Sequence, residues 1–153
     1  MRRFLVTVIA ACGIISAGCC QNTPAPKKDM AVQLYSARDL IGSPELYAKN
    51  HVEVLKAIAD MGYTGVEAAN YKNGLFYGVS PEQFKADIEA AGMEVVASHT
   101  NRKLSAKELA SGDLTEALAW WDEAIPAHKA AGMRYVVCPS MTIPETLAGL
   151  KVT

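Results

Sequence analysis

The stretches AIADMGYTGVEAA (residues 57–69), IEAAGMEVVASH (88–99) and HKAAGMRYVVCPS (128–140) repeat one pattern along the chain. Each begins with small and apolar residues that suit the end of a helix. Each then reaches a glycine, Gly62, Gly92 or Gly132, where a helix C-terminus can take the left-handed conformation that only glycine adopts at little cost. Valines follow, which are typical of strands. The pattern predicts three helix-to-strand units.

The segments between these units carry signals for helix starts. Ser43-Pro44 and Ser80-Pro81 each put a hydroxyl at the N-cap and a proline at the first helical position. Gln83 completes a predicted capping box with Ser80. The same cap-and-carboxylate spacing recurs at Asp113 with Glu116 and at Thr142 with Glu145. An apolar stripe at helical spacing predicts core packing, and its members are Phe84, Ile88 and Ala91.

With residues 30–35 as an opening strand, strands and helices alternate up to a helix that starts at Ile143. Alternation predicts a parallel sheet, and the run YVVC (135–138) suits a strand buried on both faces. Pro126 lies inside the third helical stretch, so we expect a break near Ile125. An open sheet and a closed barrel share this pattern. The segment SARDLIGS (36–43) has no GxGxxG spacing, which argues against a dinucleotide-binding sheet.

The composition fits one folded domain, and the charge argues against a nucleic-acid-binding protein. Half of the 153 residues are hydrophobic and 20% are charged, which is enough for one sizeable core. The formal net charge is −1, and no cluster of lysine and arginine offers a phosphate-binding surface. Of the four cysteines only Cys138 lies in the body of the chain, so we expect no internal disulfide there. We interpret Cys138 as a buried strand residue.

The first residues have the order of an export signal. Arg2 and Arg3 precede an apolar run over residues 4–15, and the small residues of 16–18 follow. The apolar run is too short to span a bilayer comfortably. We therefore expect the body of the protein outside the cytoplasm, whether the signal is cleaved or kept as a short membrane anchor.

The segment IISAGC (14–19) resembles a bacterial lipobox, in which the cysteine thiol is acylated and the chain is cut before it. The resemblance implies a signal peptide over 1–18 and lipidation at Cys19, with Cys20 as a less favoured acceptor. Residues 19–29 would form the anchor and tether, since QNTPAPKK (21–28) has prolines and polar residues without an apolar period. The expected location is a bacterial membrane, on its periplasmic side or at the cell surface.

Three ordered blocks carry a wider resemblance: AVQLYSARD (31–39), EVLKAIADMGYTGVEAANY (53–71) and EVVASH (94–99). Together they resemble the opening of the sugar phosphate isomerase/epimerase family, the xylose isomerase-like barrels. The resemblance implies an α/β fold, the (β/α)8 TIM barrel, with residues 30–153 as its N-terminal half and only the first four βα units present. It also implies a carbohydrate substrate and a divalent metal that assists proton transfer.

In such barrels the reactive groups lie at the C-terminal ends of the strands. His99 resembles the family's substrate-facing histidine and Glu67 a second residue of the barrel mouth, so both are predicted to be catalytic. The alternatives are a rim histidine bonded to a loop and a buried structural carboxylate. Tyr71 and Ser140 also lie near the predicted mouth, whereas His51 and His128 are interpreted as surface residues. The predicted substrate-binding residues are Gln33, Tyr35, Asn70 and Ser98.

The family's metal ligands come from later strands, so we expect none in this chain and interpret the end at Thr153 as a truncation. A half barrel leaves the edges of its first and fourth strands unpaired, which favours homo-oligomers. The leading hypothesis is an isomerase or epimerase, or a related lyase, that is inactive as this fragment. The alternatives are a non-catalytic sugar-binding lipoprotein at the cell surface and a self-associating half-barrel fragment.

Overall fold

The computed structural model describes residues 29–140. The predicted signal peptide (1–18), the lipidation site Cys19, the tether up to residue 28 and the helix that starts at Ile143 lie outside the described residues. Within 29–140, no helix is long and apolar enough to cross a membrane.

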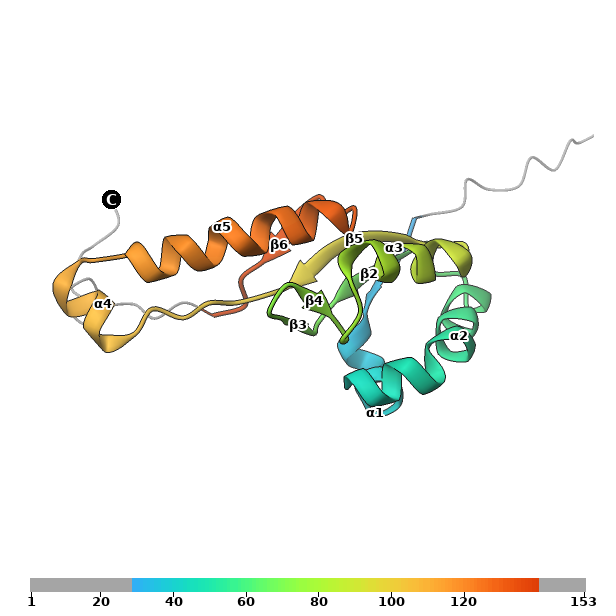
Figure 1. The fold of residues 1–153 in the computed structure, drawn as a ribbon. Coiled ribbons are helices and arrows are strands. Elements are labelled where there is room, and N and C mark those ends of the chain that lie inside the picture. Colours follow the sequence, from blue (N-terminus) through green and yellow to red (C-terminus); the bar gives the residue numbers. More distant parts are fainter. Residues whose placement is uncertain (1–28, 141–153) are drawn as a thin grey trace, which may run out of the picture.

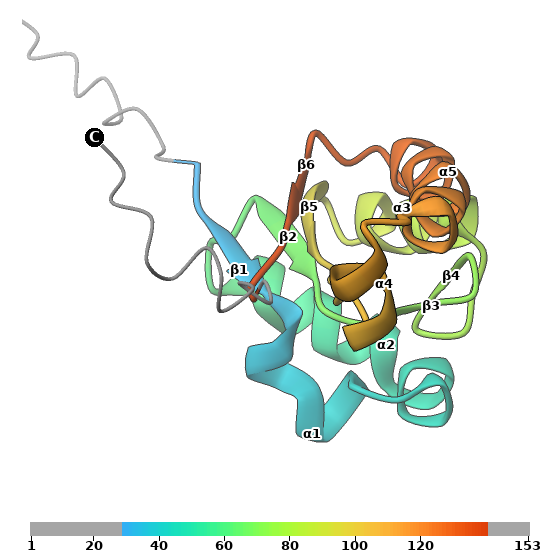
Figure 2. The same cartoon turned by 90° about the vertical axis from the view of Figure 1, so that its left-hand side faces the viewer.

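The described chain alternates strands and helices around one parallel sheet (Figure 1). The sheet has the order β1-β2-β5-β6, and each neighbouring pair is parallel. Helices α2, α3 and α5 lie on the same side of this sheet (Figure 2). The elements are β1 (Ala31–Gln33), the 3-10 helix η1 (Leu34–Ala37), α1 (Arg38–Ile41), α2 (Pro44–Asp60), β2 (Gly65–Ala68), β3 (Tyr71–Lys72), β4 (Leu75–Phe76), α3 (Pro81–Ala90), β5 (Glu94–His99), α4 (Ala106–Ser111), α5 (Thr115–Ala130) and β6 (Tyr135–Val137). The predicted parallel α/β arrangement is confirmed.

The predicted helix ends are confirmed, and so are the helix starts at Ser43 and Ser80. The predicted cap at Asp113 is wrong, because Leu114 is the N-cap of α5 and makes no side-chain cap bond. The predicted cap at Thr142 lies outside the described residues. Gly62, Gly92 and Gly132 have φ of 97°, 80° and 83° and turn the chain from helix to strand. The Ser43 and Ser80 hydroxyls accept hydrogen bonds from the backbone three residues on, as N-caps do. The predicted capping box at Ser80 is wrong, because the Gln83 side chain donates to Asp87 at 2.7 Å instead of reaching back to the cap.

The core lies between the sheet and the helices and is built on an aromatic cluster. Tyr47, Phe76, Tyr77 and Phe84 are each at most 2% exposed. Phe84 stacks on Phe76 at 5.4 Å and on Tyr77 at 5.6 Å between ring centroids. Phe84 and Ile88 of the predicted stripe are fully buried, so α3 packs on the sheet through that face as expected.

The hairpin of β3 and β4 and helix α4 were not expected from the sequence, and neither were the short helices η1 and α1 that follow β1. The hairpin of β3 and β4 turns through Asn73 and Gly74, both with positive φ, and packs beside α3. Helix α4 begins with a complete capping box between Ser105 and Glu108, and Glu108 also pairs with Arg102 at 2.6 Å. The connection from β5 to α5 is therefore partly helical.

Two predictions are wrong, one about the end of the first strand and one about a break in the third helix. The opening strand ends at Gln33, because a 3-10 turn begins at Leu34, whose side chain is buried. Pro126 does not break the third helix, which runs unbroken through it as α5. Pro126 and Asp122, the residue whose carbonyl loses its helical partner, are both exposed, so water can satisfy that carbonyl.

The predicted burial of the last strand is also wrong. Tyr135, Val136 and Val137 are 63%, 36% and 39% exposed, and Cys138 is exposed too. The reason is that β6 pairs only with β5 and forms one edge of the described sheet, with β1 at the other edge. The two edges predicted for a half barrel are therefore observed in residues 29–140.

We expect Phe84→Ala to lower the free energy of unfolding by about 3–5 kcal/mol, because it leaves a cavity in the aromatic cluster. Urea unfolding of the full chain, followed by circular dichroism, measures the effect. Val52→Ala on the exposed face of α2 is the control and is expected to stay within about 0.5 kcal/mol of the parent. A loss below about 1 kcal/mol for Phe84→Ala would contradict the packing described.

Candidate active site

Parallel pairing brings three polar residues to the same end of the sheet. Gln33, the last residue of β1, stands opposite Glu67 of β2. His99 ends β5, the next strand of the sheet. Because parallel strands finish at one edge, these side chains come from positions 34 and 66 residues apart and still meet.

A β-bulge decides which side chains of β5 join them. Val66 pairs with Val95, but Glu67 pairs with Ala97, so Val96 is an extra residue on β5. After the bulge, Ala97 and His99 share the face of Glu67, while Ser98 shares the opposite face with Ala68. If Val96 paired with Glu67 in a regular ladder, alternation of the same sequence would put Ser98 on the site face and His99 on the other.

Gly65 makes room for this bulge. A Cβ built at Gly65 would stand 2.7 Å from a methyl carbon of Val96, which is closer than carbon atoms approach without displacement. Glycine at position 65, the first residue of β2, therefore leaves space for Val96, the extra residue of β5.

The three polar side chains are bonded to one another. Gln33 Nε2 donates to Glu67 Oε1 and lies 2.8 Å from His99 Nδ1. His99 Nδ1 and Glu67 Oε1 are 3.7 Å apart, so the amide stands between the carboxylate and the imidazole. The side chains of Glu67 and His99 are 22% and 37% exposed, which leaves both open to a ligand from solvent. We call Gln33, Glu67 and His99 the mouth triad.

Ser98 lies on the helix side of the sheet, in a buried polar chain of its own. Its hydroxyl bonds to the Thr100 hydroxyl, which lies 3.0 Å from His128 Nε2. His128 Nδ1 is 2.7 Å from the carbonyl of Ala124. The structure thus separates Ser98 from the mouth triad.

His128 is a correction to the sequence interpretation, because it is 3% exposed and not a surface residue. His128 lies where α5 packs on the sheet. Its Nε2 is next to the Thr100 hydroxyl, and its ring centroid is 4.6 Å from that of Tyr71. Burial lowers the pKa of His128 below its ordinary value. Thr100 was missed by sequence reasoning, although a hydroxyl two residues after Ser98 on the same strand face was a readable signal.

Of the other predicted residues, Tyr35 is 56% exposed, and the Arg38 guanidinium lies over its ring at 4.6 Å. Asn70 is occupied in a loop contact, since its side chain donates to the Gly42 carbonyl at 2.7 Å. Ser140 lies on the surface, where it accepts a hydrogen bond from Asn101.

The described residues do not supply a metal cage. Among residues 29–140 no group of three or more His, Cys, Asp and Glu side chains could hold a metal ion. Within the mouth triad only Glu67 and His99 are metal-ligand types, and the Gln33 amide nitrogen stands between them. The divalent metal implied by the family resemblance therefore does not fit this part of the chain.

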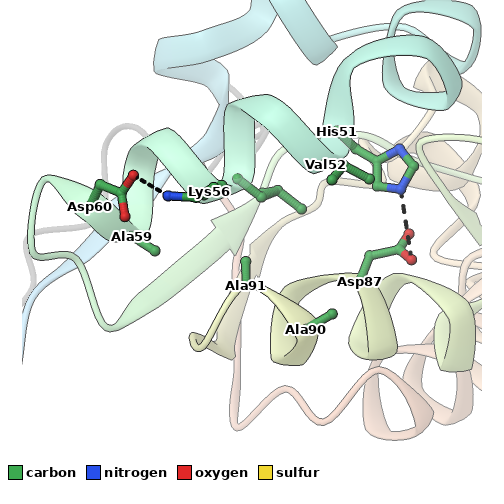
Figure 3. A pocket seen from close by; sticks show the side chains of 9 residues that line it. His51, Val52, Lys56, Ala59, Asp60, Asp87, Ala90 and Ala91 are labelled. Carbon is green, nitrogen blue, oxygen red and sulfur yellow. Dashed lines mark hydrogen bonds and ion pairs between the residues drawn. The ribbon is translucent and has the colours of Figure 1, made fainter.

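A groove of about 400 Å³ lies elsewhere, between α2 and α3 on the outer layer (Figure 3). Asp87 stands at one end, where it accepts from the Tyr47 hydroxyl and lies 3.9 Å from His51 Nε2. His51 is half-buried there. The ion pair of Lys56 and Asp60 lines the groove further along α2. None of its lining residues belongs to the mouth triad, and the helical layer is not where barrel enzymes place their chemistry.

Comparison with solved structures places this geometry in a known fold. A crystal structure of a sugar phosphate isomerase/epimerase from Parabacteroides distasonis matches with a TM-score of 0.61 and 27% identity, over 76% of this chain and 43% of that one. A second protein of that description from the same organism matches with a TM-score of 0.62 and 22% identity, over 80% and 42%. The fold is that of a partial TIM barrel.

A xylose isomerase-like TIM barrel/4-hydroxyphenylpyruvate dioxygenase fusion protein also matches, with a TM-score of 0.53 and 20% identity, over 77% of this chain and 17% of that one. The chain thus spans less than half the length of the solved structures it resembles. No protein-family model matches the chain, and no curated protein matches it.

We expect the stability of the protein to fall as the pH drops below about 6.5, because His128 resists protonation in the fold. Below that pH the unfolded chain binds a proton that the folded chain does not, so unfolding is favoured until the lowered pKa of His128 is passed. Urea unfolding at pH about 7.5 and about 5.5 measures this loss. His128→Gln should lose less stability over the same interval, and an equal loss in both proteins would contradict the expectation.

Proposed function

We propose that this chain is part of a carbohydrate isomerase or epimerase that moves a proton on its substrate with Glu67 and His99. The observation that carries the proposal is the mouth triad, in which a carboxylate and an imidazole stand side by side at the carboxyl ends of β2 and β5. Similarity to two proteins described as sugar phosphate isomerase/epimerase supports it.

Sugar isomerisation needs a proton taken from a carbon beside a carbonyl group and a hydrogen bond to the carbonyl oxygen. Glu67 is suited to accept the carbon-bound proton, and His99 is suited to donate to the oxygen. The enediol formed in this way gives an isomer when the proton returns to the neighbouring carbon. It gives an epimer when the proton returns to the other face of the same carbon.

Substrate contact in this proposal rests first on the mouth triad and on Tyr35, whose exposed ring can pack on a sugar. Gln33 and Asn70 remain candidates, but each already bonds within the chain, whereas Ser98 is buried on the opposite face of the sheet. A sugar would have to replace those bonds to reach them, which costs free energy.

Metal binding and catalytic turnover are proposed only for a longer form of the protein. The described residues do not supply metal ligands, and the chain spans 43% of the first similar structure. We therefore assign no step to a metal. The 153-residue chain is proposed to bind a carbohydrate without converting it.

A self-associating half barrel is the second candidate, and one observation favours it. The edge strand β6 exposes three successive apolar side chains, which is the kind of edge that pairs with another chain. Sedimentation of the full chain would show an oligomer whose fraction rises with concentration.

Export to a bacterial membrane completes the proposal, with diacylglycerol on Cys19 as the anchor. Its support is the sequence of residues 1–19, since acyl chains bind a bilayer through buried CH₂ groups. A non-catalytic sugar-binding lipoprotein is the alternative in which the anchor and the sugar site are kept and the chemistry is absent.

We expect Glu67→Gln to weaken sugar binding about tenfold or more, because a hydrogen bond to a charged group contributes roughly 1.5–3 kcal/mol. Saturation-transfer NMR and calorimetry with a panel of aldoses and ketoses, free and phosphorylated, measure the affinity. Glu53→Gln, at an exposed position of α2, is the matched control and should bind like the parent.

Equal affinity in both variants would remove Glu67 from the site, and a chain that binds no sugar would overturn the proposal. In D₂O we expect no deuterium to enter the bound sugar. Metal-dependent incorporation would contradict the inactivity proposed for the 153-residue chain.

For the anchor, we expect Cys19→Ala to abolish acylation and to move the protein from the membrane to the soluble fraction. Cys20→Ala should leave the lipid in place, since the favoured acceptor is kept. Intact mass spectrometry of detergent-extracted protein detects the acyl mass. Acylation that survives Cys19→Ala would contradict the assignment.

A further inference from the structure

We infer that Gln33 is a positioning residue that holds neutral His99 in one tautomer, with the proton on Nε2 and the lone pair of Nδ1 bonded to the Gln33 amide. The inference concerns the position of a proton in the mouth triad, which the sequence alone does not indicate. Its use in catalysis rests on the proposed function, whereas the tautomer itself does not.

The argument begins with the donor count of a side-chain amide. An amide nitrogen carries two hydrogens and accepts none, so both contacts of Gln33 Nε2 are donations. One hydrogen goes to Glu67 Oε1 and the other to His99 Nδ1 at 2.8 Å. Nδ1 must then be the unprotonated nitrogen, and a neutral imidazole carries its proton on Nε2.

The reverse amide orientation requires more protons. With the amide oxygen in the same place, both neighbours would have to donate, so Glu67 would be a carboxylic acid and His99 would carry its proton on Nδ1. A glutamate side chain in contact with solvent is ordinarily ionised at neutral pH. The observed orientation keeps Glu67 as a carboxylate and needs no added proton.

The other two histidines of the chain are held in the opposite tautomer. His51 Nδ1 lies 2.8 Å from the Tyr47 carbonyl, and His128 Nδ1 lies 2.7 Å from the Ala124 carbonyl. A carbonyl oxygen only accepts, so both rings carry a proton on Nδ1. His99 is thus the exception among the three histidines, and Gln33 is the side chain that makes it so.

The position of the proton determines whether His99 offers a donor or an acceptor to a substrate. Within the described part of the chain, His99 Nε2 has no hydrogen-bond partner, so its N–H is available to a substrate oxygen. Glu67 keeps its second oxygen, Oε2, free of bonds in the same part of the chain. The mouth triad therefore offers one donor and one acceptor to a ligand, which suits a carbonyl or hydroxyl oxygen beside an acidic C–H.

Removing the amide should reverse the tautomer. In Gln33→Leu nothing separates Glu67 Oε1 from His99 Nδ1, which are already 3.7 Å apart. A small movement then lets Nδ1–H donate directly to the carboxylate, which is a stronger bond than one to a neutral group. The proton leaves Nε2, and His99 presents a lone pair to the substrate instead of a hydrogen.

The test is a long-range ¹H–¹⁵N correlation spectrum of the full chain labelled in histidine, recorded at pH about 8.5, where histidines of ordinary pKa are neutral. We expect one ring with an unprotonated Nδ1 and two rings with an unprotonated Nε2. His99→Gln identifies the His99 signals by their loss. In Gln33→Leu the His99 pattern should change to that of the other two rings.

His51 and His128 report in the same spectrum that the variant is folded, because their pattern depends on α2 and α5 and not on the mouth triad. A protonated Nδ1 on His99 in the parent protein overturns the inference even if Gln33→Leu does not fold. An unchanged His99 pattern in folded Gln33→Leu overturns the role of Gln33. Sugar binding is not part of either measurement, so failure of the proposed function leaves this result standing.

Discussion

The backbone ladder that joins β1, β2 and β5 is the constraint on which the candidate site depends. Its hydrogen bonds fix each strand against the next, so the ends of three strands are aligned and Gln33 is set opposite Glu67. The helices hold the ladder from its other face, through side chains such as Phe84 and Ile88. The apolar core thus supports the ladder, and the register of the ladder sets the spacing of the polar groups in the site.

Local signals in the sequence were enough to predict the alternating fold, because glycine turns and N-caps depend on a few neighbouring residues. The hairpin of β3 and β4 was missed although it was readable, since Asn73-Gly74 is a strong turn signal between Tyr71-Lys72 and Leu75-Phe76. The exposure of β6 was not, because an apolar strand predicts burial but does not say which neighbours are present to cover it. The unbroken path of α5 through Pro126 depends on which side of the helix faces water.

The candidate site was likewise predictable from the sequence only in part. Glu67 and His99 were placed by their position at strand ends, which alternation of strand and helix makes predictable. Which of Ser98 and His99 faces the mouth depends on the one-residue bulge at Val96, and nothing in the valine run indicates which residue is extra. The buried His128 has its polar partner in Thr100, 28 residues away in the sequence, and only the fold brings the two into contact.

The bulge at Val96 also bears on how this strand tolerates a change of length. Deleting Val96 would leave Ala97, Ser98 and His99 on the faces that they occupy now, because Glu67 already pairs with Ala97 across the bulge and the remaining residues alternate from Val95. The imidazole would therefore stay at the mouth. The deletion would also remove the methyl carbon that stands against position 65, so a small side chain such as alanine would fit there. Among homologous chains, the length of this strand and the size of the residue at position 65 are expected to vary together.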